Sequence, residues 1–165
     1  MSAIRLRNTT EKDLDFVLRA EGDDTNRGFV TVWSPERHLA AIGSDDFSHL
    51  IIESPGEAGP VGYVILAGLT DPNQTVELLR IVVTAKSKGY GRATLRLIKH
   101  RVFDEWKAHR LWLDVKEHNS RARRLYESEA FIVEGTLREC VRTENGFESL
   151  VIMSILQPEY EAKGW

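Results

Sequence analysis

Apolar residues follow two different spacings along the chain, and these spacings predict where strands and helices lie. Alternating or continuous apolar runs predict strands over residues 3–7, 48–53, 60–69, 76–83, 110–116, 131–142 and 147–156. Apolar residues three and four positions apart predict helices that begin near Thr10, Ser34, Gly91 and Asn119. The predicted order is therefore β-α-α-β-β-β-α-β-α-β-β.

Capping and turn residues mark several of these boundaries. Thr10 precedes an acidic first turn, a pattern typical of a helix start. Ser34 precedes Pro35, which suits the first position of a helix. Asn145-Gly146 separates the last two apolar runs, and this dipeptide is typical of a tight turn between antiparallel strands.

The middle of the chain, residues 76–116, has the order strand, helix, strand. Such a unit joins two parallel strands by a right-handed crossover. The rest of the sheet is expected to be largely antiparallel. We therefore expect one domain over residues 1–165 of the α+β (mixed α/β) class, with a central, mostly antiparallel twisted sheet flanked by helices.

The composition narrows the class of protein further. Of the 165 residues, 42% are apolar and 28% are charged, a balance typical of a folded globular domain. The formal net charge of −3 does not favour nucleic acid or an anionic membrane as a partner. The five histidines and the single cysteine, Cys140, show no metal-ligand spacing, and no apolar run approaches the length of a membrane span. We expect a soluble, cytoplasmic protein that binds no metal, no nucleic acid and no membrane.

The most informative segment is the turn between the fourth predicted strand and the long helix that follows it. Gly89 and Gly91 allow the backbone to approach a ligand closely. The start of the helix contributes unpaired N–H groups, and Lys86, Lys88 and Arg92 add positive charge. Together these features predict an anion site suited to a pyrophosphate. The alternative is that the two glycines only shape a turn.

Three motifs of the chain resemble those of one enzyme family. Residues 86–91, K-S-K-G-Y-G, resemble the pyrophosphate loop of the GNAT N-acetyltransferases, R/Q-x-x-G-x-G/A. Residues 119–127, N-S-R-A-R-R-L-Y-E, are similar to that family's N-x-x-A-x-x-L-Y-E motif. Residues 134–139 resemble the subgroup that includes ribosomal-protein N-terminal acetyltransferases. The chain departs from the family pattern at Val83, Lys86 and Ala130.

This resemblance implies a GNAT fold and acetyl-CoA as co-substrate. The cofactor would lie where the strands at 76–83 and 110–116 separate, and its pantetheine arm would pair with the first of these strands. The arginines of the motif at 119–127 would meet the 3′-phosphate or form a solvated helix face. The residues expected to contact the cofactor are Ile81, Val82, Val83, Lys86, Lys88, Gly89, Tyr90, Gly91, Arg92, Asn119 and Arg124.

Acetyl transfer to an amine needs a base, because an amine with a pKa of about 8 to 10 is largely protonated at neutral pH. Glu77 is the preferred base, since residues 77, 79, 81 and 83 are expected to share the strand face toward the cofactor. A solvated carboxylate is the alternative role of Glu77, and Glu139 and Glu148 are reserve candidates. The resemblance implies that Tyr126 is the general acid for the leaving thiolate, although its apolar helix stripe also suits a core aromatic.

The sequence therefore predicts an acetyl-CoA-dependent N-acetyltransferase that transfers the acetyl group directly to a primary amine. The acceptor is expected to be a protein N-terminal α-amine or a small-molecule amine, and the assembly state is left open, a homodimer included. One alternative is a CoA-binding sensor domain that keeps the glycine turn and lacks catalysis. A nucleic-acid-binding domain is a second alternative, against which the net charge of −3 counts.

Overall fold

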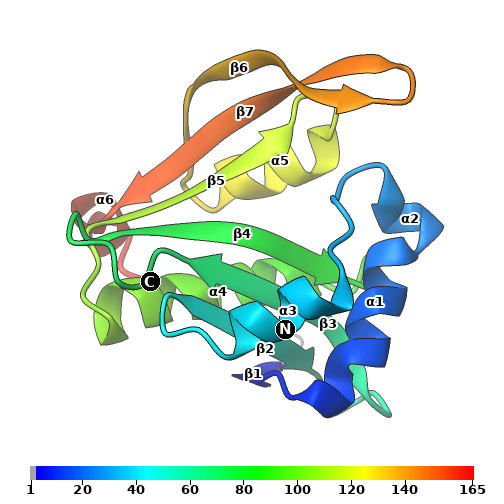
Figure 1. Ribbon diagram of the computed structural model, residues 1–165. Coiled ribbons are helices and arrows are strands. Elements are labelled where there is room, and N and C mark those ends of the chain that lie inside the picture. Colours follow the sequence, from blue (N-terminus) through cyan, green and yellow to red (C-terminus); the bar gives the residue numbers. More distant parts are fainter. Residues whose placement is uncertain (1–2) are drawn as a thin grey trace.

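The computed structural model describes residues 3–165, whose strands form a sheet in the order β1-β2-β3-β4-β5-β7-β6 (Figure 1). The strands are β1 (Arg5–Asn8), β2 (Phe47–Glu53), β3 (Pro60–Ala67), β4 (Thr75–Val83), β5 (Arg110–Lys116), β6 (Ile132–Thr143) and β7 (Gly146–Leu156). Neighbouring strands are antiparallel, except that β4 and β5 are parallel and are joined by a crossover through α4 (Tyr90–Lys99). The expected mixed α/β class with a mostly antiparallel sheet is confirmed.

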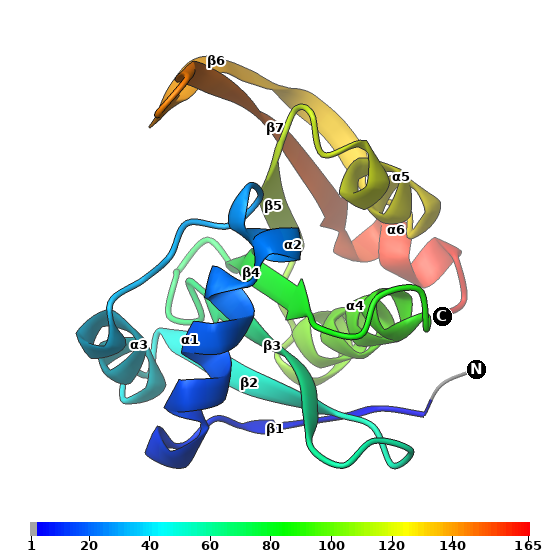
Figure 2. The ribbon, with the colours of Figure 1, turned by 90° about the vertical axis from the view of Figure 1, so that its right-hand side faces the viewer.

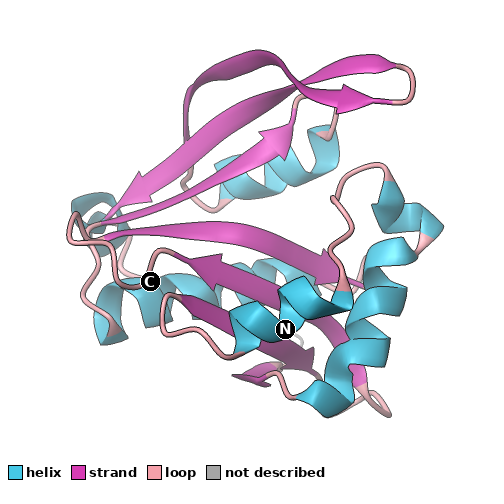
Figure 3. Ribbon diagram, viewed as in Figure 1, coloured by secondary structure: helices cyan, strands magenta, loops and turns pink. Residues whose placement is uncertain are grey.

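The helices cover both faces of this sheet. The other α-helices are α1 (Leu14–Gly22), α2 (Asp24–Arg27), α3 (Pro35–Ile42), α5 (Ser120–Ser128) and α6 (Gln157–Ala162). The helices α1 and α3 lie on one face of β2, β3 and β4, and α4 lies on the other face (Figure 3). Among residues 3–165, no helix is long and apolar enough to cross a membrane.

Two apolar clusters hold these layers together. The smaller cluster includes Val17 of α1 and Ala41 of α3, packed against Ile65 of β3. The larger cluster lies on the opposite face of the sheet and includes Leu95 of α4 and Tyr126 of α5. Burial of each large apolar side chain contributes about 1.5–3 kcal/mol to the free energy of unfolding. The two clusters therefore fix both helical layers against the sheet, and Tyr126 lies on the α4 side.

The helix starts follow the predicted capping residues. A 3₁₀ turn, Glu11–Asp13, leads into α1, and the backbone N–H of Thr10 donates to Asp13 Oδ2 at 2.8 Å. The N–H of the third residue of α3 donates to Ser34 Oγ at 3.2 Å. The side chain of Asn119 accepts a hydrogen bond at 3.2 Å from the N–H of Ala122 in the first turn of α5. These contacts satisfy helix N–H groups that have no partner within the helix.

The second half of the long helix after the glycine turn differs from the expectation. Apolar positions 95, 98, 102 and 106 follow Gly91 at helical spacing and predict one regular helix, but a π-helical segment, His100–Glu105, follows α4. The N–H of Trp106 bonds to the carbonyl of Arg101, five residues earlier. The wider turns place two adjacent side chains, Val102 and Phe103, in the core together. The short helices α2 and α6 were not predicted, since neither is long enough to show a periodicity.

A β-bulge in β4 overturns the prediction that residues 77, 79, 81 and 83 share one face of this strand. Ile65 of β3 pairs with Arg80, but the next residue of β3, Leu66, pairs with Leu78. Leu79 is therefore an extra residue in β4, and the alternation of side chains reverses across it.

As a consequence, residues 77, 79, 81 and 83 do not share one face of β4. Leu78, Ile81 and Val83 all pack in the larger cluster on the α4 side. Glu77 precedes Leu78 without a bulge between them, so its side chain projects from the opposite face, on which α1 and α3 lie. The sequence could not reveal this, because the bulge is set by pairing with β3.

Candidate active site

The strands β4 and β5 begin as neighbours and then separate. They pair at three positions, Thr75 with Arg110, Val76 with Leu111 and Glu77 with Trp112. Beyond these pairs both strands continue, and they diverge toward the side of the molecule where α2 lies (Figures 1 and 2). We call these diverging edges, residues 78–83 of β4 and 113–116 of β5, the wedge. Extended backbone without a partner strand is a template for pairing with another extended chain.

Main-chain groups of Ile81 and Val83 point into the wedge. The N–H of Thr84 donates to the carbonyl of Val61 on β3 at 2.8 Å, and alternate residues of a strand face the same neighbour. Val82 therefore faces β3, while Ile81 and Val83 face away from it. Ile81 and Val83, both predicted to contact the cofactor, thus have main-chain groups that are available at the open edge of β4. Val82 was also predicted to contact the cofactor, but its main chain faces β3 and its side chain is buried, which makes it a poor candidate for that contact.

The glycine turn leads from β4 into α4 in a left-handed conformation. Ser87 has φ = 63° and Gly89 has φ = 79°, and Gly89 directly precedes the first residue of α4. A side chain at Gly89 would be strained, because this φ disfavours residues with a Cβ. At Gly91 a Cβ would meet Leu125 Cδ2 at 3.4 Å, so α5 packs closely against this turn. The turn therefore presents N–H groups of the α4 start, as the sequence predicted.

Two of the three predicted cations have carboxylate partners that anchor the turn. Lys88 Nζ lies 2.5 Å from Glu57 Oε1, and the hydroxyl of Tyr90 donates to the same oxygen at 3.1 Å. Arg92 Nη1 lies 2.5 Å from Glu129 Oε1. The side chains of Lys88, Tyr90 and Arg92 thus fix the turn to the β2–β3 connection and to the end of α5. Because these side chains are engaged, the main chain is the part of these residues that remains available to a ligand of the turn.

Lys86 has the electrostatic setting of an anion-binding group. Its Nζ donates to Asn26 Oδ1 at 2.6 Å, and no carboxylate of residues 3–165 lies within ion-pair distance of it. Burial and the nearby charge of Arg121 lower the pKa of Lys86, with Asp23 acting weakly in the other direction. Arg121 Nη2 in turn donates to Ser87 Oγ at 3.3 Å. Within the described part of the chain, neither Lys86 nor Arg121 has a carboxylate partner, which favours binding of a negative group at this end of the turn.

The helix α5 carries the other predicted cofactor residues and the predicted acid. The side chain of Asn119, which was predicted to contact the cofactor, caps the helix and so holds the local backbone. The side chain of Arg124 is exposed to solvent. Tyr126 is 8% exposed, and its hydroxyl has no hydrogen-bond partner among residues 3–165. Burial, and then the charge of Asp114, raise the pKa of Tyr126 to about 12, so the phenol is protonated at neutral pH.

Glu77 and Asp114 form a carboxylate pair where the strands separate. Asp114 lies two residues beyond Trp112, the β5 partner of Glu77, so both side chains project from the same face. Neither carboxylate has a hydrogen-bond or ion-pair partner in the described part of the chain. Burial, and then the charge of Asp114, raise the pKa of Glu77 to about 7. Although Asp114 reaches solvent, the protein around it removes enough water to raise its pKa as well.

The reserve base candidates are in less suitable surroundings. Glu148 lies 2.9 Å from Lys116 Nζ and 3.4 Å from His118 Nε2. The ion pair with Lys116 lowers the pKa of Glu148, which weakens it as a proton acceptor. Glu139 is exposed on the edge strand β6, as is the neighbouring Cys140. Glu77 is therefore the best-placed base of the three.

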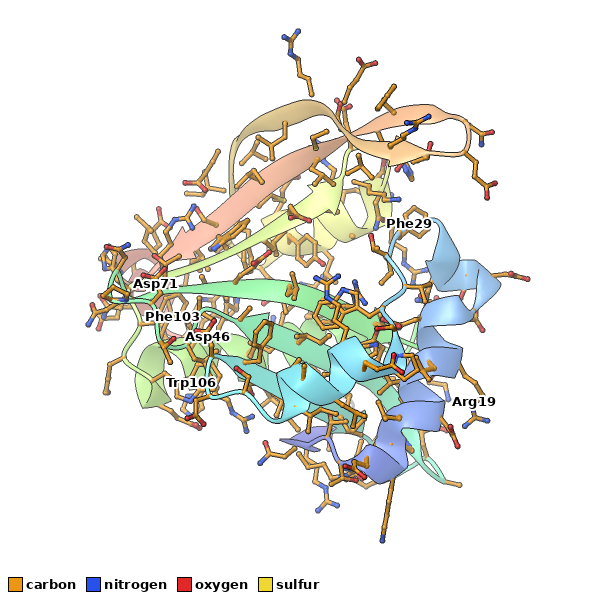
Figure 4. The ribbon with its side chains drawn as sticks, viewed as in Figure 1. Arg19, Phe29, Asp46, Asp71, Phe103 and Trp106 are labelled. Atoms are coloured by element: carbon orange, nitrogen blue, oxygen red, sulfur yellow. The ribbon has the colours of Figure 1, made fainter. Side chains whose placement is uncertain are left out.

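The segment after α2 reaches across the open end of the wedge. The carbonyl of Gly28 accepts a hydrogen bond from Lys116 Nζ, at the end of β5, at 3.0 Å. The rings of Phe29 and His118 lie 5.4 Å apart, and Figure 4 shows Phe29 on the side of this segment that faces α5. Together with the contact between Asn26 and Lys86, these contacts connect the α1–α3 region to both sides of the wedge.

A buried polar network, which sequence reasoning missed, lies on the same face as Glu77. Glu21 of α1 is fully buried, and Glu21 Oε1 lies 2.9 Å from His38 Nε2 and 3.3 Å from the N–H of Trp33. Its Oε2 accepts from the hydroxyl of Tyr63 at 2.9 Å and from Arg80 Nη1. Burial alone would raise the pKa of Glu21, but hydrogen bonds from His38 and Tyr63 and the charge of Arg80 lower it. The network therefore holds an ionised carboxylate in the core.

The network continues through a second histidine. His38 Nδ1 lies 3.0 Å from His49 Nε2, and His49 Nδ1 lies 2.8 Å from Thr9 Oγ1. Burial, and then the charge of nearby His38, lower the pKa of His49 to about 4, so His49 is neutral at pH 7. The signal available in the sequence was Glu21 itself, which continues the apolar stripe of Leu14 and Val17 at helical spacing.

A separate hollow of about 340 Å³ lies at the opposite end of the sheet from the open wedge. Its lining includes Asp71 and Trp106, which Figure 4 places near Phe103 and far from Phe29. The carboxylate of Asp71 is already engaged by the N–H of Asn73 at 2.8 Å. This hollow therefore lacks the chemistry found at the wedge.

Proteins of known structure share this fold. The chain is similar to spermidine N-acetyltransferase from Vibrio cholerae in a crystal structure with CoA and spermine, with 21% identity, a TM-score of 0.86, and coverage of 96% of this chain and 98% of that one. It is also similar to spermidine/spermine N-acetyltransferase SpeG from Vibrio cholerae in complex with manganese ions, with 21% identity, a TM-score of 0.82, and coverage of 98% and 97%. These likenesses show the shared fold. The sequence profile of the acetyltransferase (GNAT) family matches residues 13–131, and the chain therefore belongs to this family of acetyltransferases.

Proposed function

We propose that this protein is an acetyl-CoA-dependent N-acetyltransferase that transfers the acetyl group directly to a primary amine in a ternary complex. The observation that carries the proposal is the wedge. Here two parallel strands separate after three paired positions, next to a left-handed glycine turn that starts a helix. An extended chain that ends in a pyrophosphate fits this combination, because one part needs a strand edge and the other needs N–H donors.

The donor set suits acetyl-CoA in particular. The backbone groups of Ile81 and Val83 face away from β3 and would pair with a pantetheine amide chain, and the N–H groups after Gly89 would bind the pyrophosphate. Lys86, which has no carboxylate partner in residues 3–165, adds a positive charge at the turn. The exposed side chain of Arg124 is available to the 3′-phosphate from α5.

Residues around the point where β4 and β5 separate supply the proton transfers. Acetyl-CoA supplies a thioester carbonyl, at which the carbon–nitrogen bond forms as the carbon–sulfur bond breaks. Glu77 takes the proton that the amine loses, directly or through water, and its pKa near 7 suits a base that works at neutral pH. The N–H of Ile81 or Val83 donates to the carbonyl oxygen as negative charge develops on it.

Tyr126 acts on the sulfur side of the reaction. The residue is buried, but its hydroxyl has no partner in the described chain and is free to donate to the departing thiolate. Its pKa of about 12 exceeds that of an ordinary thiol, which is near 8.5. We therefore expect Tyr126 to stabilise the thiolate mainly by a hydrogen bond, with full proton transfer completed as solvent enters.

The acceptor is proposed to be a cationic small-molecule amine, and spermidine is the first to test. The similar Vibrio cholerae enzyme is a spermidine N-acetyltransferase whose crystal structure contains spermine. The unpartnered carboxylates of Glu77 and Asp114 suit an ammonium group that approaches the wedge. A peptide with a free N-terminus belongs in the same panel, because residues 134–139 resemble the ribosomal-protein N-terminal acetyltransferases.

The experiment begins with a thermal-shift titration with acetyl-CoA and CoA, with ATP and NAD as controls. A ligand that binds only the folded state should stabilise it by about 2.7 kcal/mol at 100 times its Kd. Gly89→Asp places a carboxylate at the turn and should abolish the shift with CoA. Thiol release from acetyl-CoA is then measured with spermidine, simpler monoamines and a free N-terminal peptide.

Three outcomes separate the candidate functions. A CoA-specific shift with amine-dependent thiol release supports the transferase. A shift without turnover on any amine favours the CoA-binding sensor, and the absence of a shift contradicts the proposed anion site.

A further inference from the structure

We infer that Glu129 is a positioning residue that sets the place of Tyr126 relative to the glycine turn. The inference rests on the proposed function, because it assumes that Tyr126 acts at the cofactor sulfur. Its basis is an ion cluster that joins the end of α5 to one face of α4, and that none of the sequence motifs includes.

The single carboxylate of Glu129 forms ion pairs with three cations of α4. Glu129 Oε1 lies 2.5 Å from Arg92 Nη1, and Glu129 Oε2 lies 3.2 Å from Arg96 Nε and 3.0 Å from Lys99 Nζ. Lys99 Nζ also donates to the carbonyl of Glu129 at 3.0 Å. The three cations are four and three residues apart, so they form one row along α4.

The cluster is shielded from water at its centre. The side chains of Glu129 and Lys99 are both 0% exposed. The ring of Trp165 covers Lys99, with its centroid 3.6 Å from Nζ. Charges in such surroundings interact strongly and are screened little by salt, so the cluster fixes the distance between the two helices.

The cluster contacts the proposed site at two places, the glycine turn and the end of α5 near Tyr126. Arg92 lies in the first turn of α4, directly after the glycine turn. The N–H of Glu129 donates to the carbonyl of Tyr126 at 3.1 Å, and the N–H of Phe131 donates to the same carbonyl at 3.0 Å. Ala130 between them has φ = 73°, so the chain turns sharply here and cannot move without disturbing the end of α5. A displacement of Glu129 is therefore passed to the Tyr126 hydroxyl, and a misplacement of about 1 Å can cost 10²-fold in rate.

The test uses Glu129→Gln, which keeps the size of the side chain and removes its charge. Glu127→Gln is the matched control, since Glu127 is exposed two residues earlier in α5. Thiol release from acetyl-CoA is measured with the fastest amine of the panel, or as slow hydrolysis if no amine reacts. We expect Glu129→Gln to lower kcat about tenfold or more, with a change in CoA affinity of about threefold or less. Glu127→Gln should leave both unchanged, and Glu129→Asp should recover part of the rate.

A double-mutant cycle distinguishes positioning of Tyr126 from general loosening of the fold. In the Tyr126→Phe background, Glu129→Gln should have no further effect on kcat, because the hydroxyl that it positions is gone. Hydrogen–deuterium exchange of the ligand-free protein should show faster exchange over residues 120–128 in Glu129→Gln and not in Glu127→Gln. If Glu129→Gln does not fold, Arg96→Gln should give the same pattern at smaller amplitude, because Arg96 is part exposed.

Two results would overturn the inference and leave the proposed function standing. One is a wild-type kcat in a folded Glu129→Gln protein that binds CoA normally. The other is an equal fold-loss of kcat in the wild-type and Tyr126→Phe backgrounds. Failure of the wild-type protein to bind CoA would instead contradict the proposed function itself.

Discussion

Two glutamates on the same face of the sheet, Glu21 and Glu77, have opposite electrostatic surroundings. Glu21 is fully buried, and its two oxygens accept from His38, Tyr63, Arg80 and the backbone, which together lower its pKa despite burial. Glu77 is half-buried and has no hydrogen-bond partner in the described chain, and burial beside Asp114 raises its pKa to about 7.

The difference shows that partners, and not burial alone, decide what a buried carboxylate does. Burial disfavours the charged form in both cases. At Glu21 the donors overcome this cost, so the carboxylate stays ionised and serves to join α1, α3, β3 and β4. At Glu77 nothing overcomes it, so the carboxyl titrates where a proton can be gained or lost at neutral pH. We therefore expect Glu21 to matter for stability and Glu77 for catalysis.

The largest expected effect is on stability, from Glu21→Gln. The substitution leaves the guanidinium of Arg80, whose side chain is 7% exposed, without its counter-charge. Breaking a buried ion pair on one side costs about 3–5 kcal/mol in the free energy of unfolding. Chemical denaturation measures this loss, with Glu36→Gln on the exposed face of α3 as the control. A loss no larger than that of the control would contradict the role assigned to the network.

Glu77→Gln should leave the fold intact and lower kcat by about 10²-fold, the low end of the range for loss of a general base. The wild-type rate should rise as the pH increases through about 7, because Glu77 must be ionised to accept a proton. In the variant this rise should disappear, while the CoA-induced thermal shift stays the same. A pH profile that does not change would show that another group, or water, is the base.

His49, at the far end of the Glu21 network, predicts that the free energy of unfolding decreases in acid. The folded pKa of His49, about 4, lies below its ordinary value of 6.5, so the unfolded chain takes up the proton first. The free energy of unfolding should therefore fall as the pH decreases from about 6.5 to about 4, by on the order of 1 kcal/mol per pH unit. His49→Gln should lose this part of the slope in denaturation series at several pH values. If the free energy of unfolding of His49→Gln still falls over this pH range, another group must be responsible for the titration.

The smallest expected effect tests how much Asp114 contributes to the raised pKa of Glu77. Asp114→Asn removes the charge that helps to raise the pKa of Glu77, so the rise of the rate with pH should shift to lower pH. At pH 8 the rate should change by about threefold or less, because Glu77 is ionised in both proteins. A profile that stays in place would mean that burial alone sets this pKa. A large loss at pH 8 would instead indicate that Asp114 binds the acceptor amine.

Several parts of the site could be predicted because their signals are local. The turn at Gly89, the cap at Asn119 and the strand-helix-strand order each depend on residues close together in the chain, and all three are present. The face of Glu77 was predicted wrongly, because the bulge at Leu79 arises from the pairing of β4 with β3. Lys86, Lys88 and Arg92 were all predicted to add positive charge to the anion site. Among these three, only Lys86 lacks a carboxylate partner in residues 3–165.

The sequence by itself determined the order of the seven strands and the four longer helices, the residues near which those helices begin, and the position of the glycine turn. Propensity, capping and positive φ act within a few residues, so the chain carries these signals without its fold. Only the tertiary structure decided which carboxylate is ionised and where two strands separate. Residues far apart in sequence, such as Glu21 and Arg80, set each other's charge once packing removes the water between them. Such long-range pairs leave no spacing in the sequence from which they could be recognised.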